Sequence, residues 1–416
     1  MTTPTNTPPT PVAPAKRMVI LDVIRGFALL GILLMNIEFF QRALQSLMLG
    51  FNSDQSGLDY AVAWFSFSFI QGKFYTMFSL LFGLGFIVFI DRAMQRGVAA
   101  KWLFSRRLLV LLCFGMAHLI FIWGGDILHL YAAVGFLLLL FTQSSVKRLW
   151  RWGLVLFAVP VVFMWLGAFA IQAALQAPDG GAQMLAGFAD DQAKLLKDIA
   201  KGELIYASAG YWDVVQWRIY EWRSLYLDGG ILFFVPMILG MFLIGAAFGR
   251  AGVFADTKAH SVLFARMMVF GYGVGIPAAL VWGVYGTEVN MLYPTVRTAA
   301  LVTCSHVASL ALCLAYIGTL VTLYDRGAVW LHRLAPAGRM ALTNYLMQSV
   351  VFTLLFYGYG LGFYGEFGRA AVTLLALLLY GFQLWFSHWW LQRFRAGPLE
   401  WLWRSLTYGQ RQPLTR

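Results

Sequence analysis

Three side chains close together in the sequence have the types that acid–base chemistry needs: His118, Asp126 and His129. Asp126 and His129 are three residues apart, so a helix would place them on one face. The turn Trp123-Gly124-Gly125-Asp126 is short enough to bring His118 beside them. Histidine exchanges protons near neutral pH, and a carboxylate can orient it. We therefore predict a proton-transfer group. A metal site and a set of satisfied buried polar groups are the alternatives, and the metal site lacks a clear further ligand.

Charged residues also lie inside the first two apolar stretches. Asp22 and Arg25 are three apart near the start of the first stretch, and Lys73 interrupts the second. Ionised groups at membrane depth are costly and tend to face a bundle interior or a wet cavity. Arg25 would suit a phosphate or carboxylate arriving from the cytoplasm, or the pair would only hold the bundle together. We expect Lys73 to face a cavity, as a candidate partner of Asp22, rather than to extend to the membrane surface.

Further polar side chains lie in other apolar stretches, and we count them as a polar core. Asn344 and Gln348 share a helical face, which favours interhelical hydrogen bonds. The remaining members of this core are Asn36 and His306. Three cysteines, Cys113, Cys304 and Cys313, form no CxxC motif, so we expect buried small hydrophobic residues without a disulfide.

Composition indicates which elements must position these residues. The 416-residue chain is 60% hydrophobic and only 12% charged, which is too apolar for a soluble protein of this length. It predicts an all-α polytopic integral membrane protein with about ten transmembrane helices. The net charge of +12 fits basic cytoplasmic loops rather than nucleic-acid binding, since no basic patch with interleaved aromatics is present. The expected spans are 18–40, 58–90, 103–123, 125–142, 149–176, 230–250, 261–285, 297–323, 340–362 and 368–392.

The second of these stretches is too long for one crossing, and Gln71-Gly72-Lys73-Phe74 interrupts it, so we expect two helical pieces or one strongly tilted helix. Most lysines and arginines fall in the segments that are cytoplasmic if the N-terminus is inside, which predicts an N-in/C-in topology. Residues 1–15 are rich in Pro and Thr and read as a disordered tail without a cleavable signal peptide. Residues 16–407 form one membrane domain, followed by a tail at 408–416. Within the membrane domain, segment 177–229 is an outer loop, which we predict to be an ordered cap because it is rich in Trp and Tyr.

Five stretches resemble the YeiB-like bacterial membrane proteins. They are LDVIRGFALLGILLMNI at 21–37, QGKFYTMFSLLFGLGF at 71–86, GDILHLYAAVGF at 125–136, GRMALTNYLMQS at 338–349 and GPLEWLWRSLTYG at 397–409. The resemblance covers nearly the whole chain from residue 16, with the defining C-terminal half at about 230–407. YeiB-like proteins are grouped with transmembrane acyltransferases such as heparan-α-glucosaminide N-acetyltransferase.

The resemblance implies an enzyme of the bacterial cytoplasmic (inner) membrane. It would move an acyl group, most simply acetyl, from cytoplasmic acyl-CoA to a hydroxyl or amine of an outer glycan, lipid or small molecule. Asp22, Arg25 and Lys73 would then line the acyl-CoA entrance, and His118 or His129, assisted by Asp126, would be the base. No metal is expected. Oligomeric state stays open, a homo-oligomer included.

One departure from the relatives bears on the mechanism. The lysosomal N-acetyltransferase group has a functional histidine between its first two spans, whereas residues 41–57 here contain none. The base must then come from His118 or His129. No GxxxxGK[ST], HExxH or GxSxG motif offers another chemistry. Two alternatives from other classes remain: a small-molecule or lipid transporter built around the broken second stretch, and a non-catalytic membrane scaffold.

Overall fold

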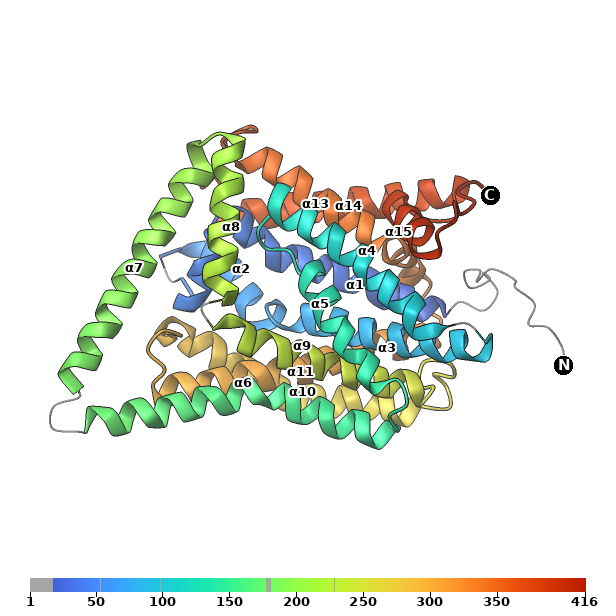
Figure 1. Ribbon diagram of the computed structural model, residues 1–416, viewed down its shortest axis with the longest axis horizontal. Coiled ribbons are helices and arrows are strands. Elements are labelled where there is room, and N and C mark those ends of the chain that lie inside the picture. The colour runs from blue at the N-terminus through green and yellow to red at the C-terminus, as the bar shows by residue number, and fades with distance from the viewer. Residues whose placement is uncertain (1–17, 53, 98, 177–180, 228) are drawn as a thin grey trace.

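The computed structural model describes residues 18–52, 54–97, 99–176, 181–227 and 229–416. Within these ranges every secondary-structure element in the chain order is a helix (Figure 1). The predicted all-α class is therefore confirmed. The disordered tail predicted at 1–15 lies outside the described residues.

The helices follow the expected spans closely. Before the predicted outer segment they are α1 (Val19–Asn36), α2 (Gly57–Phe65), α3 (Lys73–Gln95), α4 (Ala100–Phe121), α5 (Leu128–Leu137) and α6 (Val146–Leu175). The outer segment contains α7 (Gly181–Ser208) and α8 (Tyr211–Leu227). After it come α9 (Gly230–Arg250), α10 (Ser261–Tyr285), α11 (Val296–Asp325), α12 (Ala335–Arg339), α13 (Ala341–Phe356), α14 (Arg369–Arg393) and α15 (Pro398–Tyr408).

Eight helices in the described ranges are long and apolar enough to cross a membrane, and two shorter apolar helices, Leu128–Phe141 and Ala341–Phe356, accompany them. The chain is thus a multi-pass membrane protein. Expected span 340–362 is too long, because α13 ends at Phe356 and the glycine-rich stretch after it turns back, with Gly362 at φ +74°.

The interruption of the second stretch is a true break. A π-helical segment, Ser66–Ile70, follows α2, and the chain then turns through Gln71 and Gly72 before α3 begins at Lys73. Gly72 has φ +86°, a conformation that side-chain-bearing residues rarely adopt. Of the two alternatives, two helical pieces or one strongly tilted helix, the structure shows two helical pieces.

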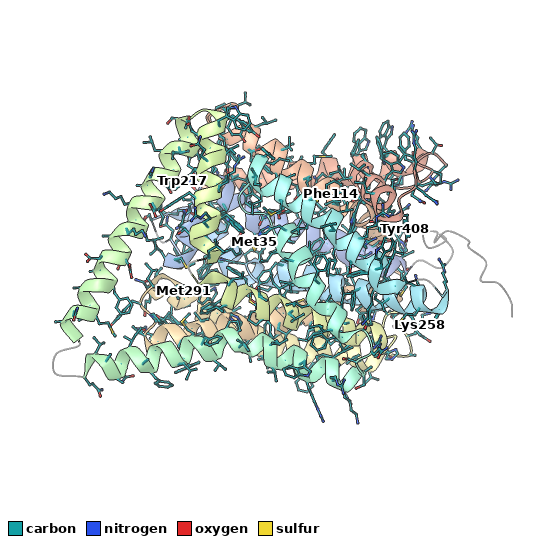
Figure 2. All side chains as sticks on the ribbon, in the orientation of Figure 1. Met35, Phe114, Trp217, Lys258, Met291 and Tyr408 are labelled. Carbon is teal, nitrogen blue, oxygen red and sulfur yellow. The ribbon has the colours of Figure 1, made fainter. Side chains whose placement is uncertain are left out.

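The two ends of the molecule are formed by different parts of the chain. The start of α1 and helix α15 lie at one end, and α7 crosses the opposite end (Figure 1). Lys258 and Tyr408 mark the first end, while Trp217 and Met291 mark the second (Figure 2). The N-in/C-in topology with an outer cap at α7 and α8 is compatible with this arrangement and stays a prediction.

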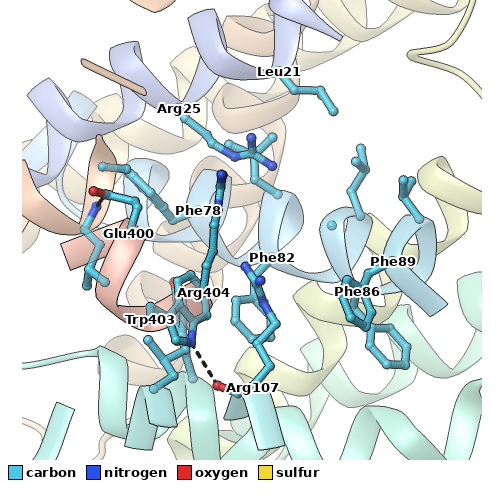
Figure 3. Close-up of a pocket in the computed structure, with 18 of the residues that line it drawn as sticks. Leu21, Arg25, Phe78, Phe82, Phe86, Phe89, Arg107, Glu400, Trp403 and Arg404 are labelled. Atoms are coloured by element: carbon cyan, nitrogen blue, oxygen red, sulfur yellow. Dashed lines mark hydrogen bonds between the residues drawn. The ribbon is translucent and has the colours of Figure 1, made fainter. Parts of the chain in front are cut away.

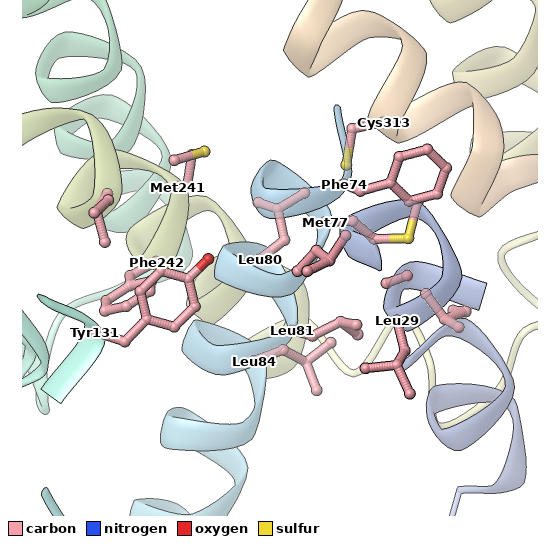
Figure 4. Packing of buried hydrophobic residues seen from close by; sticks show 14 of the residues in the cluster. Leu29, Phe74, Met77, Leu80, Leu81, Leu84, Tyr131, Met241, Phe242 and Cys313 are labelled. Carbon is pink, nitrogen blue, oxygen red and sulfur yellow. The ribbon is translucent and has the colours of Figure 1, made fainter. Parts of the chain in front are cut away.

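Helix α3 is the centre of the core. Its residues Leu80, Leu81 and Leu84 pack against α1, α5, α9 and α11 (Figure 4). Glycines set the closest contact, since a Cβ on Gly83 would collide with the Phe242 carbonyl and one on Gly245 with the Leu80 carbonyl. Small residues at such contacts let membrane helices approach and gain packing energy. α3 and α9 therefore form a fixed pair.

Candidate functional site

The structure brings the three predicted proton-transfer residues together. His118 lies near the end of α4, Asp126 in the turn, and His129 in the first turn of α5. Nδ1 of His118 is 2.7 Å from Oδ1 of Asp126, and Nδ1 of His129 is 2.8 Å from Oδ2. The His129 backbone N–H also donates to Oδ2 at 2.8 Å. One carboxylate thus links both imidazoles.

A glycine makes this hairpin possible. Gly115, one turn before His118 on α4, lies so close to the start of α5 that a Cβ there would collide with the backbone nitrogen of His129. The side chains of His118 and Asp126 are fully shielded from solvent. Because a buried polar group is costly when unpaired, the Asp126 hydrogen bonds hold the turn as well as the histidines.

Helix α8, which belongs to the segment predicted as a cap, covers one side of the cluster. Nε1 of Trp222 lies 3.1 Å from Nε2 of His129, and the Trp222 and Tyr226 rings both pack near the His129 ring. Two charged residues of α8, Arg218 and Glu221, are fully buried. Glu221 accepts hydrogen bonds from the Leu44 backbone at 3.0 Å and from the Tyr206 hydroxyl at 2.6 Å, and burial raises the pKa of its carboxyl to about 7.

A cavity of about 450 Å³ opens on the other side of the cluster, between α1, α3, α4, α13 and α15 (Figure 3). Its charged lining is mainly basic. The lining includes six arginines, Arg25, Arg92, Arg96, Arg107, Arg339 and Arg404, against two acids, Asp22 and Glu400. Its apolar wall comes from α1, α3 and α4, with Leu29, Phe82 and Leu108 among the contributors. A ligand with anionic groups and an extended apolar or neutral arm matches this lining.

Both acids are engaged with the protein. Asp22 pairs with Arg25 at 3.0 Å. Glu400 accepts hydrogen bonds from the backbone N–H groups of Leu342 and Thr343 and from the Thr343 hydroxyl. These are the free N–H groups of the first turn of α13, so Glu400 caps that helix.

Arg107 is held by aromatic rings. Its guanidinium lies 3.8 Å from the centre of the Trp403 ring and 5.8 Å from that of Phe89. The Trp403 indole in turn donates to the Arg107 carbonyl at 3.0 Å. Arg25, Arg107 and Arg404 approach one another in the cavity (Figure 3), although they come from α1, α4 and α15. Stacking fixes a guanidinium while leaving its N–H groups free for an anion.

One end of the cavity lies next to the His–Asp cluster, although His118, Asp126 and His129 do not themselves line it. Ile127 and Leu128, which separate Asp126 from His129 in sequence, line it, and so does Tyr345 of α13. The Tyr345 ring packs at 5.2 Å from the His118 ring. Tyr345 therefore stands between the arginine-lined space and His118.

Sequence reasoning missed most of the cavity. The sequence predicts no site role for Trp222 or for the five arginines Arg92, Arg96, Arg107, Arg339 and Arg404, which belong to the basic residues that predict the topology. The motifs at 338–349 and 397–409 contain Arg339, Glu400 and Arg404. These charged residues within the motifs were the signal in the sequence that could have indicated the cavity.

Lys73 differs from the prediction in its position. Its side chain is fully buried, it does not line the cavity, and its Nζ has no hydrogen-bond partner among the described residues. The pairing with Asp22 is therefore wrong. The physical reason is local: Arg25 lies one turn from Asp22 on the same helix and occupies that carboxylate.

Two of the four predicted polar-core residues, Asn344 and Gln348, make interhelical hydrogen bonds. Asn344 donates to Ser387 Oγ at 2.9 Å, and Gln348 donates to Gln383 at 2.9 Å, which joins α13 to α14. His306 bonds to the Val302 carbonyl of its own helix, and Asn36 is buried at the end of α1. Among the cysteines only Cys313 is buried; Cys113 is exposed on the outer face of α4, and Cys304 is half-buried.

Within the described ranges, no group of three or more His, Cys, Asp and Glu residues is arranged to hold a metal ion. Fold and composition define a polytopic helical membrane protein. Comparison with known proteins identifies its relatives. The family described as "Protein of unknown function (DUF418)" matches residues 248–410.

Several relatives match almost the full chain, and two of them are at least 30% identical to it. The "Uncharacterized protein YxaH" of Bacillus subtilis (strain 168) is 35% identical over 98% of this chain and 98% of its own. The "Uncharacterized protein YeiB" of Escherichia coli (strain K12) is 30% identical over 94% of this chain and 96% of its own. The chain belongs to the YeiB-like family of bacterial membrane proteins. No solved structure matches it.

Proposed function

We propose that this protein is an acyl-CoA-dependent acyltransferase of the bacterial cytoplasmic membrane and a member of the transmembrane acyltransferase superfamily. It transfers an acyl group, most simply acetyl, from cytoplasmic acyl-CoA to a hydroxyl or amine of an acceptor on the outer side. One observation carries the proposal: an arginine-lined cavity ends beside a buried His–Asp cluster.

The cavity suits the donor. CoA carries phosphates at one end, a long neutral arm, and the thioester at the other end. Arg25, Arg107 and Arg404 supply guanidinium groups for phosphates, which bind guanidinium strongly. The apolar stretch beyond them accommodates the arm and places the thioester near Tyr345. Lys73 takes no part in donor binding, since it lies outside the cavity lining.

The cluster suits the transfer. An imidazole held by the Asp126 carboxylate removes the proton from the acceptor hydroxyl or amine as its oxygen or nitrogen attacks the thioester carbon. General-base assistance of this kind contributes about 10²–10⁴ in rate. The acceptor, a glycan, lipid or small metabolite, approaches from the side that α8 covers.

The deciding experiment is donor binding. The purified protein is heated with acetyl-CoA, with CoA or with free acetate, each at millimolar concentration. We expect acetyl-CoA and CoA, but not acetate, to raise the apparent melting temperature. If neither coenzyme changes it, the acyltransferase proposal fails and the transporter and scaffold alternatives gain support.

A further inference from the structure

The hydrogen bond from Trp222 determines where the proton of His129 lies. An indole N–H can only donate, so Nε2 of His129, 3.1 Å away, must accept and carries no proton. The ring proton is therefore on Nδ1, where it is donated to Oδ2 of Asp126 at 2.8 Å. In this arrangement both nitrogens of His129 are occupied.

His118 is in a different position. An ionised Asp126 only accepts hydrogen bonds, so Nδ1 of His118, 2.7 Å from Oδ1, carries a proton. Its Nε2 is buried and has no hydrogen-bond partner among the described residues. With its single ring proton on Nδ1, His118 keeps a free lone pair on Nε2. It is also the ring that contacts Tyr345, at the end of the cavity.

From this asymmetry we propose that the two histidines have different roles: His118 is the base, and His129 is a positioning residue whose ring proton Trp222 keeps on Nδ1. The proposal rests on the acyl-transfer function above. Nε2 of His118 takes the acceptor proton as the new acyl bond forms and the carbon–sulfur bond breaks. The same proton then passes from Nε2 to the CoA thiolate, so His118 returns to its starting state.

Trp222 matters because Asp126 is shared. If His129 gained a proton, its positive charge would neutralise Asp126 and repel the proton that His118 must accept. The Trp222 indole donates to Nε2, the nitrogen that would take this proton, and so competes with that protonation. Trp222 therefore preserves the full carboxylate charge for His118, although it does not contact the reacting atoms.

The first test needs no turnover. Solid-state ¹⁵N NMR of histidine-labelled protein reports which ring nitrogen carries the proton. We expect protons on Nδ1 in the rings of both His118 and His129. Their Nε2 signals should differ, because only Nε2 of His129 accepts a hydrogen bond from Trp222. Trp222→Phe should move only the His129 Nε2 signal, and Trp212→Phe, an exposed indole of the same helix, should move neither. A proton on Nε2 of His118, or a His129 signal unaffected by Trp222→Phe, overturns the proposal.

The second test separates the roles by activity. Release of CoA thiol from acetyl-CoA is measured for membranes that contain each variant. His118→Asn should lose at least about 100-fold in kcat. His129→Asn, whose amide can still donate to Asp126, should retain activity within about tenfold of wild type, with KM for acetyl-CoA unchanged.

A double variant provides the control on Trp222. Trp222→Phe should lower kcat but not raise KM, and adding it to His129→Asn should cause no further loss, because Trp222 acts through His129. Equal losses for the two histidine variants, or additive losses for the double variant, contradict the assignment. If the wild-type protein neither binds nor consumes acetyl-CoA, the acyl-transfer function itself fails, and the NMR result still shows where the protons lie.

Discussion

The Glu400 carboxylate on α15 accepts a hydrogen bond from the Thr343 hydroxyl on α13 at 2.6 Å. Two motifs that lie far apart in the sequence, at 338–349 and 397–409, meet in this contact. It attaches the C-terminal helix to the bundle and places Trp403 and Arg404 in the cavity wall. The family-defining C-terminal region is thus part of the cavity rather than a separate module.

Glu400 caps the first turn of α13, and removing its carboxylate should destabilise the protein. Glu400→Ala leaves three donors of Leu342 and Thr343 without an acceptor, and each buried unsatisfied donor costs about 1–3 kcal/mol. We expect a lower apparent melting temperature in a thermal-unfolding assay. Glu366→Ala, at an exposed position in the loop after α13, serves as the control and should change little. Equal melting temperatures for Glu400→Ala and wild type would show that the cap is not needed.

The close approach at Gly115 predicts a large effect from one methyl group. Gly115→Ala should push the start of α5 away from α4, since the new Cβ meets the His129 nitrogen. We expect lower stability. In ¹⁵N NMR we also expect both histidines to lose the Nδ1 signals that report the hydrogen bonds to Asp126. Gly273→Ala on α10 is the matched control, because a Cβ there has no neighbour within 4 Å. If both variants behave alike, the contact at Gly115 is not restrictive.

Arg107 should contribute strongly to donor binding. Arg107→Gln removes a guanidinium that Trp403 holds in place, and we expect Kd for CoA to rise about 10-fold or more, as charge-assisted hydrogen bonds are worth about 1.5–3 kcal/mol. Calorimetric titration measures the change. Arg148→Gln removes an exposed arginine outside the cavity lining and should leave Kd unchanged. Matching affinities for the two variants would exclude Arg107 from the donor site.

Helices α7 and α8, the segment predicted as an outer cap, should become less stable as pH rises through the titration of Glu221. The pKa of this carboxyl is raised from 4.5 to about 7 by burial, so the folded cap holds a proton that the unfolded cap releases. Stability therefore falls between about pH 4.5 and 7, by about 3 kcal/mol in total, and is constant above. Hydrogen exchange of α8 amides between pH 5 and 8, corrected for intrinsic exchange, measures this. Glu221→Gln should flatten the profile; an unchanged slope would assign it to other groups.

The sequence predicted the parts of this structure that depend on local pattern. Apolar runs located the helices, and the short turn before Asp126 predicted the His118–Asp126–His129 cluster, because neighbours in sequence must be neighbours in space. The arginine cavity was not predictable in this way. Its walls come from α1, α3, α4, α13 and α15, and the charge of Arg107 or Arg404 looks the same in sequence whether it faces solvent or a cavity. Trp222 was hidden for the same reason, since nothing near α5 indicates that α8 folds over it.

Close glycine contacts also determine which wall of the cavity can move. Gly26 and Gly338 lock α1 against α12, since a Cβ at Gly26 would strike the Leu334 carbonyl and one at Gly338 the Asp22 carbonyl. The Tyr380 hydroxyl further anchors the Gly26 carbonyl at 2.7 Å. α1 and the fixed pair α3 and α9 act as a rigid frame. Helix α15 is held to α13 through Glu400, so a bulky ligand that needs more room would have to displace the α4–α5 hairpin.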